Sequence, residues 1–221
     1  MKILAVADYE EKSLWGKWGA EMADKLSDVD LVLSAGDLSS YYLEFLTDKL
    51  NVPLVYVSGN HDTGYKENPP KRCIDTDGRI TDLKIRKDNT YQIVRILGLG
   101  GSMRYKDGAY QYSEEEQSNR VEILMRDLES NKREAADINI LLTHAPCRGY
   151  GDMDDVPHRG FDCFNDLLNR WKPKMHCYGH IHQEYNAFAG QESKESGFVR
   201  LINHPSGTYL INGCGYQFIQ I

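Results

Sequence analysis

Side chains that can bind a metal ion or transfer a proton stand directly after five short apolar runs of the sequence. They are Asp8, Glu10, Asp37, Asn60, His61, Asp62, His144, His180 and His182. Carboxylate, amide-oxygen and imidazole ligands suit Mn²⁺, Fe or Zn²⁺, and the lack of thiolates among them argues against a structural zinc site. These are more ligands than one ion with an open coordination position would take. They suit two ions that share a bridging carboxylate. That arrangement favours phosphoryl chemistry.

The five apolar runs are predicted to be strands of a largely parallel sheet. They are KILAVA, DLVLSA, VPLVYV, INILLT and MHCY, at residues 2–7, 30–35, 52–57, 138–143 and 175–178. Between them, apolar residues recur at three- and four-residue spacing, which predicts helices at 14–26, 41–50, 121–129 and 163–171. This alternation indicates βαβ units. Because the carboxyl ends of parallel strands share one edge of a sheet, the polar residues should converge there.

Two regions depart from this alternation. Residues 79–101 read as two or three strands joined by a polar Lys-Asp-Asn turn, and residues 197–221 as a hairpin with an Asn-His-Pro-Ser-Gly turn and a final strand. These antiparallel strands predict a second sheet packed on the first. Ser113 and Glu116 match a capping box and predict that a helix begins there. No linker divides the chain, so residues 1–221 are expected to form a single domain.

Composition and charge limit the class of protein. The 221 residues are 41% hydrophobic and 27% charged, which is typical of soluble globular proteins. No apolar stretch reaches the roughly 18 residues that cross a bilayer, and the start MKILAVAD is too short for a signal-peptide core. Five cysteines without a CxxC pair read as reduced thiols, so we expect a cytoplasmic protein. The net charge of −7 argues against nucleic-acid binding, unless bound metals reverse the sign locally.

Each of these polar residues, taken alone, has an ordinary structural explanation. An aspartate after a strand is usually a helix N-cap or a turn residue, and Gly59-Asn60 is a common turn dipeptide. A lone histidine such as His144 is more often packed and hydrogen-bonded than catalytic. His180 and His182 would face one side of a strand, but such pairs also arise by chance. The coincidence at five strand ends favours a functional site.

The motifs, in their order along the chain, resemble those of the calcineurin-like metallophosphoesterases. The matching residues are Asp8, Gly36-Asp37, Gly59-Asn60-His61-Asp62, His144 and Gly179-His180-x-His182. The resemblance implies an α/β fold, namely a four-layer α-β-β-α sandwich of two mixed sheets flanked by helices. It also implies a dinuclear metal-dependent phosphoesterase that hydrolyses phosphomonoesters or phosphodiesters.

The resemblance assigns a role to each motif residue. The implied ligands are Asp8 and His182 for the first divalent ion, Asn60, His144 and His180 for the second, and Asp37 as the bridge. His61 would protonate the leaving-group oxygen as a general acid, and Asp62 would orient its imidazole. A hydroxide that bridges the two ions would attack phosphorus. Mn²⁺ is the expected metal, with Fe and Zn²⁺ as the alternatives.

The first motif departs from the family's pattern. The family usually has Asp-x-His, whereas this sequence has Asp8-Tyr9-Glu10. We hypothesise that the Glu10 carboxylate replaces the imidazole as a ligand of the first ion, which would favour a harder ion such as Mn²⁺ over Zn²⁺. The alternative is that Glu10 points to solvent and the first ion is weakly held.

Four further residues are candidates for substrate binding. Arg148, His158 and Arg159 would bind the non-reacting phosphate oxygens or a nucleotide-like group; alternatively, residues 148–162 are a solvated loop capped by its own acids. Arg104 is a similar candidate. The expected partner is a small phosphoester, whose identity the sequence leaves open together with the oligomeric state. The competing functions are a non-catalytic scaffold with weakened metal binding and a nuclease of the same family, and the acidic net charge argues against the nuclease.

Overall fold

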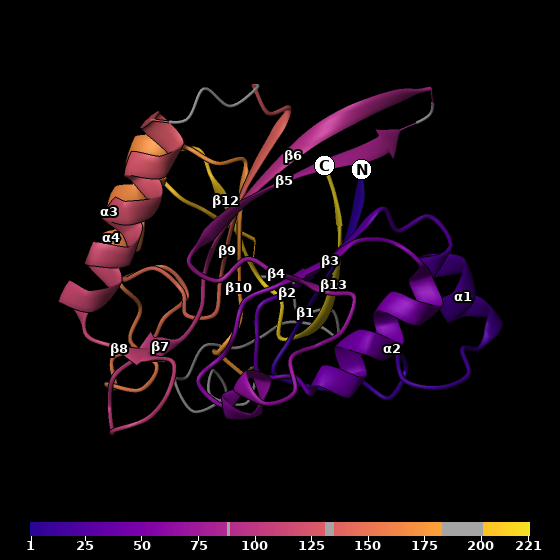
Figure 1. The fold of residues 1–221 in the computed structure, drawn as a ribbon, viewed down its shortest axis with the longest axis horizontal. Coiled ribbons are helices and arrows are strands. Elements are labelled where there is room, and N and C mark those ends of the chain that lie inside the picture. Colours follow the sequence, from indigo (N-terminus) through magenta and orange to yellow (C-terminus); the bar gives the residue numbers. More distant parts are fainter. Residues whose placement is uncertain (88, 131–134, 183–200) are drawn as a thin grey trace.

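Two β-sheets lie face to face, and a pair of helices covers the outer face of each sheet (Figure 1). The computed structural model describes residues 1–87, 89–130, 135–182 and 201–221. The helices are α1 (Ala20–Leu26) and α2 (Ser40–Leu50) on the first sheet, and α3 (Glu114–Ser130) and α4 (Asp162–Trp171) on the second. The chain thus forms the four-layer α-β-β-α sandwich that the resemblance implies.

The first sheet has the strand order β13-β1-β2-β3-β4. Its strands are β1 (Lys2–Ala7), β2 (Leu31–Ser34), β3 (Leu54–Tyr56), β4 (Ile74–Asp75) and β13 (Gly215–Gln220). Strands β1 to β4 run parallel to one another, and β13 pairs with β1 in the antiparallel sense. A 3-10 helix, η1 (Thr63–Lys66), follows β3. The carboxyl ends of β1, β2 and β3 therefore lie at one edge.

The second sheet has the strand order β11-β12-β10-β9-β6-β5. Its strands are β5 (Arg79–Lys87), β6 (Thr90–Leu99), β9 (Ile138–Thr143), β10 (Met175–Tyr178), β11 (Leu201–Asn203) and β12 (Tyr209–Asn212). The four inner strands are parallel, and the two outer ones, β5 and β11, are antiparallel to their neighbours. A small parallel pair, β7 (Ser102–Met103) and β8 (Gln111–Tyr112), lies apart from both sheets.

Side chains of the central strands alternate between two apolar layers. In β1, Ile3 enters the layer between the sheets, whereas Leu4 packs in the layer beneath α1 and α2. In β9, Ile140 likewise faces the other sheet and Leu141 packs beneath α3 and α4. Because both faces of these strands are buried, their sequences are continuous apolar runs instead of alternating patterns.

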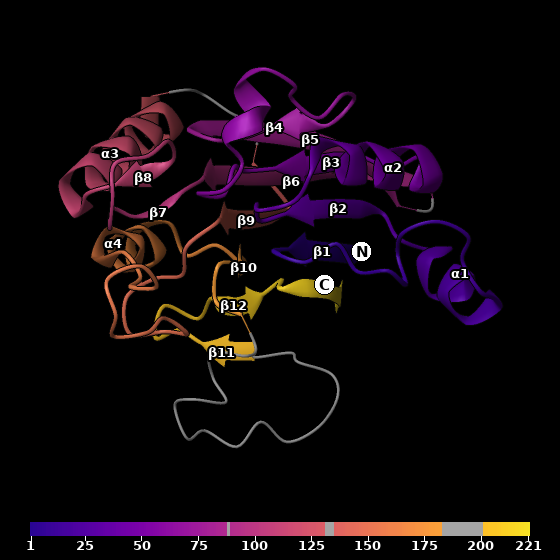
Figure 2. The same ribbon diagram turned by 90° about the horizontal axis from the view of Figure 1, so that it is seen from below.

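The five apolar runs are divided between the two sheets, so the expectation of one parallel sheet holding all five is wrong. Strands β1, β2 and β3 belong to the first sheet, and β9 and β10 belong to the second. Their carboxyl ends still meet, because β1 faces β10 and β2 faces β9 across the sheet interface (Figure 2). The final strand, β13, also differs from expectation, since it joins the first sheet and not the second.

The helix predicted at 14–26 begins only at Ala20. Gly16 has a φ of 97°, a left-handed conformation that an α-helix does not contain, and Gly19 is the N-cap residue. The apolar spacing of residues 14–19 therefore reflects packing of a turn, since Leu14 is buried in the layer beneath the helices. The other three predicted helices are confirmed.

Local capping and turn signals are confirmed where the structure describes them. Ser113 Oγ accepts a hydrogen bond from the Glu116 N–H at 3.2 Å, and Glu116 Oε2 accepts one from the Ser113 N–H at 2.7 Å, so α3 begins at a capping box. The pairs β5–β6 and β11–β12 are the two predicted hairpins. Residue 88 of the first turn and residues 197–200 of the second segment lie outside the described residues.

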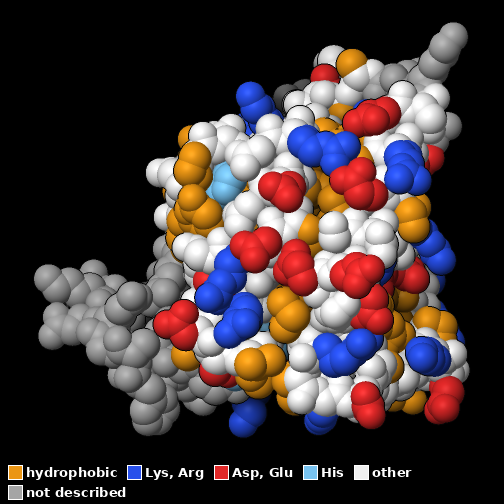
Figure 3. Space-filling model, turned by 90° about the vertical axis from the view of Figure 1, so that its left-hand side faces the viewer, with side chains coloured by type: hydrophobic (Ala, Val, Ile, Leu, Met, Phe, Trp, Pro, Cys, Tyr) orange, Lys and Arg blue, Asp and Glu red, His pale blue; other side chains and the backbone are white. Residues whose placement is uncertain are grey.

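Acidic and basic side chains are interspersed over the face that carries α3 and α4 (Figure 3). Ion pairs such as Arg170–Glu122 and Arg104–Glu116 occur among them. All five cysteines are free, in agreement with the lack of a CxxC pair. Within the described residues, no helix has the length and apolar character needed to span a membrane.

Candidate metal centre

The predicted ligands come together at the edge where the strands of both sheets end. Asp8 follows β1, Asp37 follows β2, and His144 and His180 follow β9 and β10 of the other sheet. Backbone hydrogen bonds fix the strand ends to one another: the Asp8 N–H donates to the Gly36 carbonyl at 3.1 Å. The Asp8 carboxylate in turn accepts from the His180 N–H at 3.0 Å, which joins the two sheets at the site.

The backbone at the site adopts conformations that most residues avoid. Asp8, Asp37 and His180 have φ values of 65°, 58° and 69°. Such left-handed residues are uncommon outside glycine, cost about 1–3 kcal/mol each, and cluster at functional sites. Two glycines permit the close approach of the loops. A Cβ at Gly36 would lie 2.4 Å from the Gly59 nitrogen, and one at Gly59 would lie 2.0 Å from Asp37 Oδ1.

Four of the predicted ligands form a buried cluster, which we call the inner ligand group: Asp37, Asn60, His144 and His180. Asp37, His144 and His180 each offer one ligand atom, and these atoms lie within 4.8 Å of one another. His144 Nε2 is 3.4 Å from Asp37 Oδ2 and 3.0 Å from Asn60 Oδ1. The amide oxygen of Asn60 therefore faces the same small space.

Backbone carbonyls select the tautomers of both imidazoles. The Ala35 carbonyl lies 2.7 Å from His144 Nδ1, and the Pro157 carbonyl lies 2.7 Å from His180 Nε2. A carbonyl oxygen can only accept, so each of these ring nitrogens carries a proton, and in the neutral form of each ring the other nitrogen, His144 Nε2 or His180 Nδ1, has the lone pair. His144 Nε2 faces Asp37 Oδ2 and Asn60 Oδ1, which are also acceptors. A cation fits such a cluster of acceptors.

The electrostatics of the inner ligand group favour one positive charge. Burial lowers the pKa of His144, but the Asp37 carboxylate outweighs burial and raises that pKa above its ordinary value. Burial raises the pKa of Asp37, and His144 in turn brings it below the ordinary value. Burial and the neighbouring His144 lower the pKa of His180, which keeps its imidazole neutral. A bound cation would take the place of the proton on His144.

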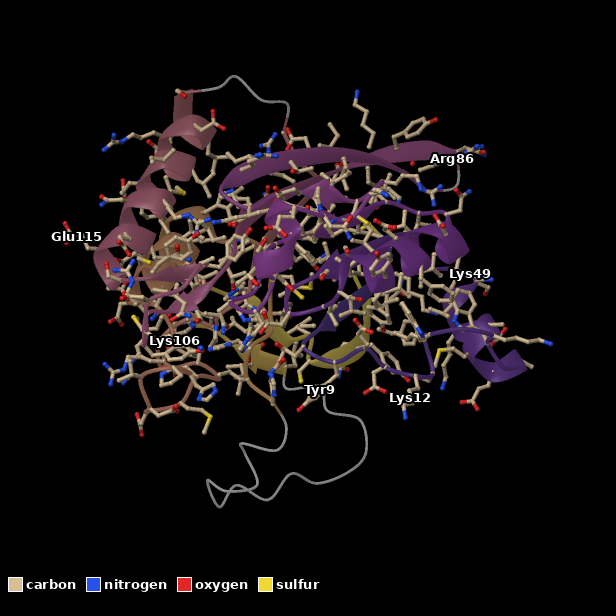
Figure 4. The ribbon with its side chains drawn as sticks, turned by 60° about the horizontal axis from the view of Figure 1, so that its bottom comes forward. Tyr9, Lys12, Lys49, Arg86, Lys106 and Glu115 are labelled. Carbon is tan, nitrogen blue, oxygen red and sulfur yellow. The ribbon has the colours of Figure 1, made fainter. Side chains whose placement is uncertain are left out.

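Asp8 and His182 form a second, more open pair, which we call the outer ligand group. The Asp8 side chain is fully buried, its Oδ1 lies 3.6 Å from His182 Nε2, and the His182 side chain is 25% exposed. His182 Nδ1 lies 3.1 Å from the hydroxyl of Tyr9, and the two rings are 4.9 Å apart. The Tyr9 side chain lies at the lower edge of the molecule (Figure 4).

The Glu10 carboxylate is engaged with the start of α2. Its Oε1 accepts a hydrogen bond from the Ser39 N–H at 3.0 Å, next to the N-terminus of that helix, where an anion is electrostatically favoured. Glu10 is exposed, but it is bound to a backbone group and does not simply point to solvent. The structure thus gives Glu10 a partner other than a metal, and its role as a ligand stays a prediction.

The loop that carries His61 and Asp62 is held by hydrogen bonds between the Asp62 carboxylate and backbone amides. Asp62 Oδ2 accepts from the N–H groups of Gly59 and Asp37 at 2.7 and 2.8 Å. No described hydrogen bond joins Asp62 to the His61 imidazole, so the orientation of that ring by Asp62 stays a prediction. The His61 ring is exposed, and its backbone N–H donates to Asp37 Oδ1 at 2.8 Å. Burial and the Asp37 charge raise the pKa of Asp62 to about 7.

The four candidate substrate-binding residues are held by neighbours. Arg148 pairs with Asp152 at 2.8 Å, and Arg104 pairs with Glu116 at 2.6 Å. Arg159 donates to the Asp154 carbonyl at 3.3 Å. His158 lies 2.6 Å from Asp155, and its ring is 5.2 Å from that of His180. The loop is thus capped by its own acids, as the alternative interpretation has it, and of the four residues only His158 contacts a predicted ligand.

Three partners of the predicted ligands were not identified from the sequence. Ala35 and Pro157 contribute backbone carbonyls, which no side-chain motif reveals. Tyr9 lies inside the first motif, between Asp8 and Glu10, and its phenol was a visible signal at that position.

A family model for calcineurin-like phosphoesterases matches residues 1–184, so the chain belongs to this family. Among curated proteins it is 26% identical to UPF0046 protein K07C11.7 of Caenorhabditis elegans, over 73% of this chain and 59% of that protein. It is 34% identical to UPF0046 protein T07D4.2 of the same organism, over 31% of this chain and 16% of that protein. The chain therefore matches less than two thirds of the length of each of these relatives.

Two solved structures share the fold. TT1561 of Thermus thermophilus superposes with a TM-score of 0.61 at 12% sequence identity, covering 97% of this chain and 89% of that one. A candidate 5′-nucleotidase of Staphylococcus aureus superposes with a TM-score of 0.50 at 13% identity, covering 96% of this chain and 48% of that one. At such low identity these structures show the fold alone.

Proposed function

We propose that the protein is a metal-dependent phosphoesterase that hydrolyses phosphomonoesters or phosphodiesters at a centre of two divalent ions. The observation that carries this proposal is the inner ligand group. Ligand atoms of Asp37, His144 and His180 lie within 4.8 Å of one another, and a backbone carbonyl holds one nitrogen of each imidazole, which leaves the other nitrogen to bind an ion. Family membership supports the same conclusion.

The ligand groups would hold the two ions in different surroundings. Asn60, His144 and His180 would bind the inner ion, Asp8 and His182 the outer ion, and Asp37 would lie between them. Divalent ions held there would supply the Lewis acidity and the nucleophile of phosphoester hydrolysis. The mixture of carboxylate, amide oxygen and imidazole suits Mn²⁺, with Fe or Zn²⁺ as alternatives.

The residues of the Gly59–Asp62 loop would position the proton donor. The backbone N–H of His61 is bound to Asp37 and its side chain is exposed, so a leaving-group oxygen near the ions would lie within reach of the imidazole. The Asp62 carboxylate accepts hydrogen bonds from two backbone amides and so holds the loop in place. The loop in turn fixes the direction in which the His61 side chain points. Asp62 would thus act on His61 through the loop, without a direct contact with its ring.

The test of this proposal is turnover of p-nitrophenyl phosphate and bis(p-nitrophenyl) phosphate with added Mn²⁺. We expect hydrolysis of at least one ester and binding of two ions per chain. His61→Ala should keep both ions and lose roughly 10²–10⁴-fold in kcat. Asp37→Asn keeps a residue type that tolerates a left-handed backbone but removes the charge between the ions, so it should lose both ions and activity. Asp28→Asn, an exposed acid paired with Lys2, is the matched control.

The second candidate function is a non-catalytic scaffold, and the position of Glu10 favours it. With this carboxylate on Ser39, the outer ion keeps fewer protein ligands than the inner one. A protein that binds neither ion and hydrolyses neither ester would be the scaffold. The nuclease alternative has less support, because acidic and basic side chains are mixed on the described face in Figure 3.

A further inference from the structure

The side of the centre beyond His61 opens into a cavity of about 380 Å³. It extends from Asp37 and His61 at one end to side chains of α2, η1 and the segment after η1 at the other. The residues that matter for its chemistry are Leu38, Tyr41, Gly64, Tyr65 and Asn68. Its volume lies within the range of pockets that bind small molecules.

Away from Asp37 and His61, the cavity is lined by two tyrosines and Leu38 beside the polar residues Ser39, Ser40 and Asn68. The Tyr65 hydroxyl donates to the Leu38 carbonyl at 2.5 Å, which satisfies its polar group and leaves the ring as a wall. Tyr56 packs edge-on against Tyr65 at 5.5 Å between ring centroids and supports it. Tyr41 also lines the cavity and is 68% exposed. The side chains of Tyr41 and Tyr65 are therefore both part of the cavity wall.

The charges of the cavity are confined to its catalytic end. Among the residues that the structure describes, no lysine or arginine lines it, and its titratable side chains apart from the tyrosines are Asp37, His61 and Asp62. Asn68 donates through Nδ2 to Ser40 Oγ at 2.9 Å, which leaves its amide oxygen as an acceptor. The N-terminus of α2 also lines the cavity, but Glu10 already accepts from the Ser39 N–H there. A further anionic group would find no cationic side chain on these walls, whereas an uncharged group with a hydrogen-bond donor would find a partner.

We infer that this cavity binds the leaving group of the ester and selects an uncharged alcohol with a planar aromatic body. The inference rests on the proposed function, because an ester whose phosphoryl group binds at the ligand groups would extend its leaving group past His61 into this space. The ring of the leaving group would pack on Tyr41 and Tyr65. Because no lysine or arginine is among the described lining residues, a leaving group that carries a carboxylate or a further phosphate would be disfavoured.

The kinetic test compares phenyl phosphate with ethyl phosphate in matched variants. A Cβ at Gly64 would have no atom within 4 Å, so Gly64→Leu should narrow the cavity without displacing the backbone. Tyr41→Ala removes one aromatic face. Each variant should lower the ratio of kcat/KM for phenyl phosphate to that for ethyl phosphate about fivefold relative to the wild type. Tyr91→Ala, which removes an equally exposed tyrosine from β6, should leave the ratio unchanged.

A second substrate pair tests the charge of the leaving group. In the wild type, 4-carboxyphenyl phosphate should have a kcat/KM about tenfold below that of phenyl phosphate, because the added carboxylate would lose water against uncharged walls that offer no lysine or arginine among the described residues. Equal values for the two esters would contradict the charge selection.

A binding test separates this inference from the catalytic proposal, since it needs neither metal nor turnover. Phenol titrated into the metal-free protein should shift the backbone amide resonances of Gly64 and Tyr65, and Gly64→Leu should abolish the shift at Tyr65. Shifts without hydrolysis of any ester would support the cavity and overturn the proposed function. Hydrolysis with a substrate ratio that neither variant changes, and with no phenol-induced shift, would overturn the cavity and leave the phosphoesterase intact.

Discussion

The inner and outer ligand groups lie at the same edge of the fold but differ in what holds their imidazoles. In the inner group, the carbonyls of Ala35 and Pro157 hold both rings, and a carbonyl can only accept, so each tautomer is fixed. In the outer group, the partner of His182 is the Tyr9 hydroxyl, which can donate or accept. The imidazole of the outer site is therefore held by a side chain that is itself partly exposed, and we expect this site to bind its ion more weakly.

The largest expected effect is a loss of metal affinity, and it distinguishes the inner from the outer ligand group directly. His144→Ala should lower the affinity for the inner ion by more than about 100-fold, whereas His182→Ala should affect only the outer, weaker site. Isothermal titration with Mn²⁺ measures both steps in each variant. Equal losses from the two substitutions, or loss of both ions from His182→Ala, would mean that the groups are not distinct.

The next effect tests the close contact beneath the inner group. Gly59→Ala would place a Cβ 2.0 Å from Asp37 Oδ1, so Asp37 must move. We expect the inner ion to be lost and the free energy of unfolding to fall by about 1–3 kcal/mol. Metal analysis and urea unfolding measure the two effects.

Gly64→Ala is the matched control for that substitution, because its Cβ would have no neighbour within 4 Å. The control should bind the inner ion with unchanged affinity. If Gly59→Ala had a normal metal content, metal binding would not depend on the position of the Asp37 side chain against Gly59.

A smaller effect is expected from Tyr9. Tyr9→Phe keeps the ring that packs on His182 and removes only the hydroxyl, so it should weaken the outer ion about tenfold and leave the inner ion unchanged. The stoichiometry and the two titration steps report this without any activity assay. Tyr91→Phe, on an exposed site of β6, provides the control.

The smallest effect is expected from Glu10. Because its carboxylate is bound to the Ser39 N–H, Glu10→Ala should change neither metal affinity by more than about threefold, and it should cost about 0.3–1 kcal/mol of stability through the helix terminus. A clear drop in outer-ion binding would instead show that Glu10 leaves Ser39 to ligate the ion, as the sequence-based hypothesis states.

The sequence predicts those parts of the fold that are determined by residues close together in the chain. The capping box at Ser113 is read from four adjacent residues, and the buried strands are read from their own apolar runs. The assignment of β9 and β10 to the second sheet depends on which strands pair, and residues distant in sequence decide that. The start of the first helix was predicted too early, because the apolar residues around Gly16 have helical spacing although they pack in a turn.

The same distinction applies to the candidate site. Its residue types were visible because carboxylates and imidazoles followed five strands. Its supports were not visible, since Ala35 and Pro157 act through carbonyl groups that every residue possesses. The partners of Asp62 and Glu10 are likewise backbone amides, so side-chain chemistry alone assigned the first to His61 and the second to a metal.

The hydrogen bond between the His180 N–H and the Asp8 carboxylate joins residues 172 positions apart. Closing so long a loop is entropically costly and slow, so the centre can form only after both sheets have docked. The unfolded chain would then offer a cation no comparable cluster of ligands. Added Mn²⁺ should therefore raise the melting temperature in proportion to the logarithm of its concentration, because the ions would stabilise the protein only once its assembly is complete.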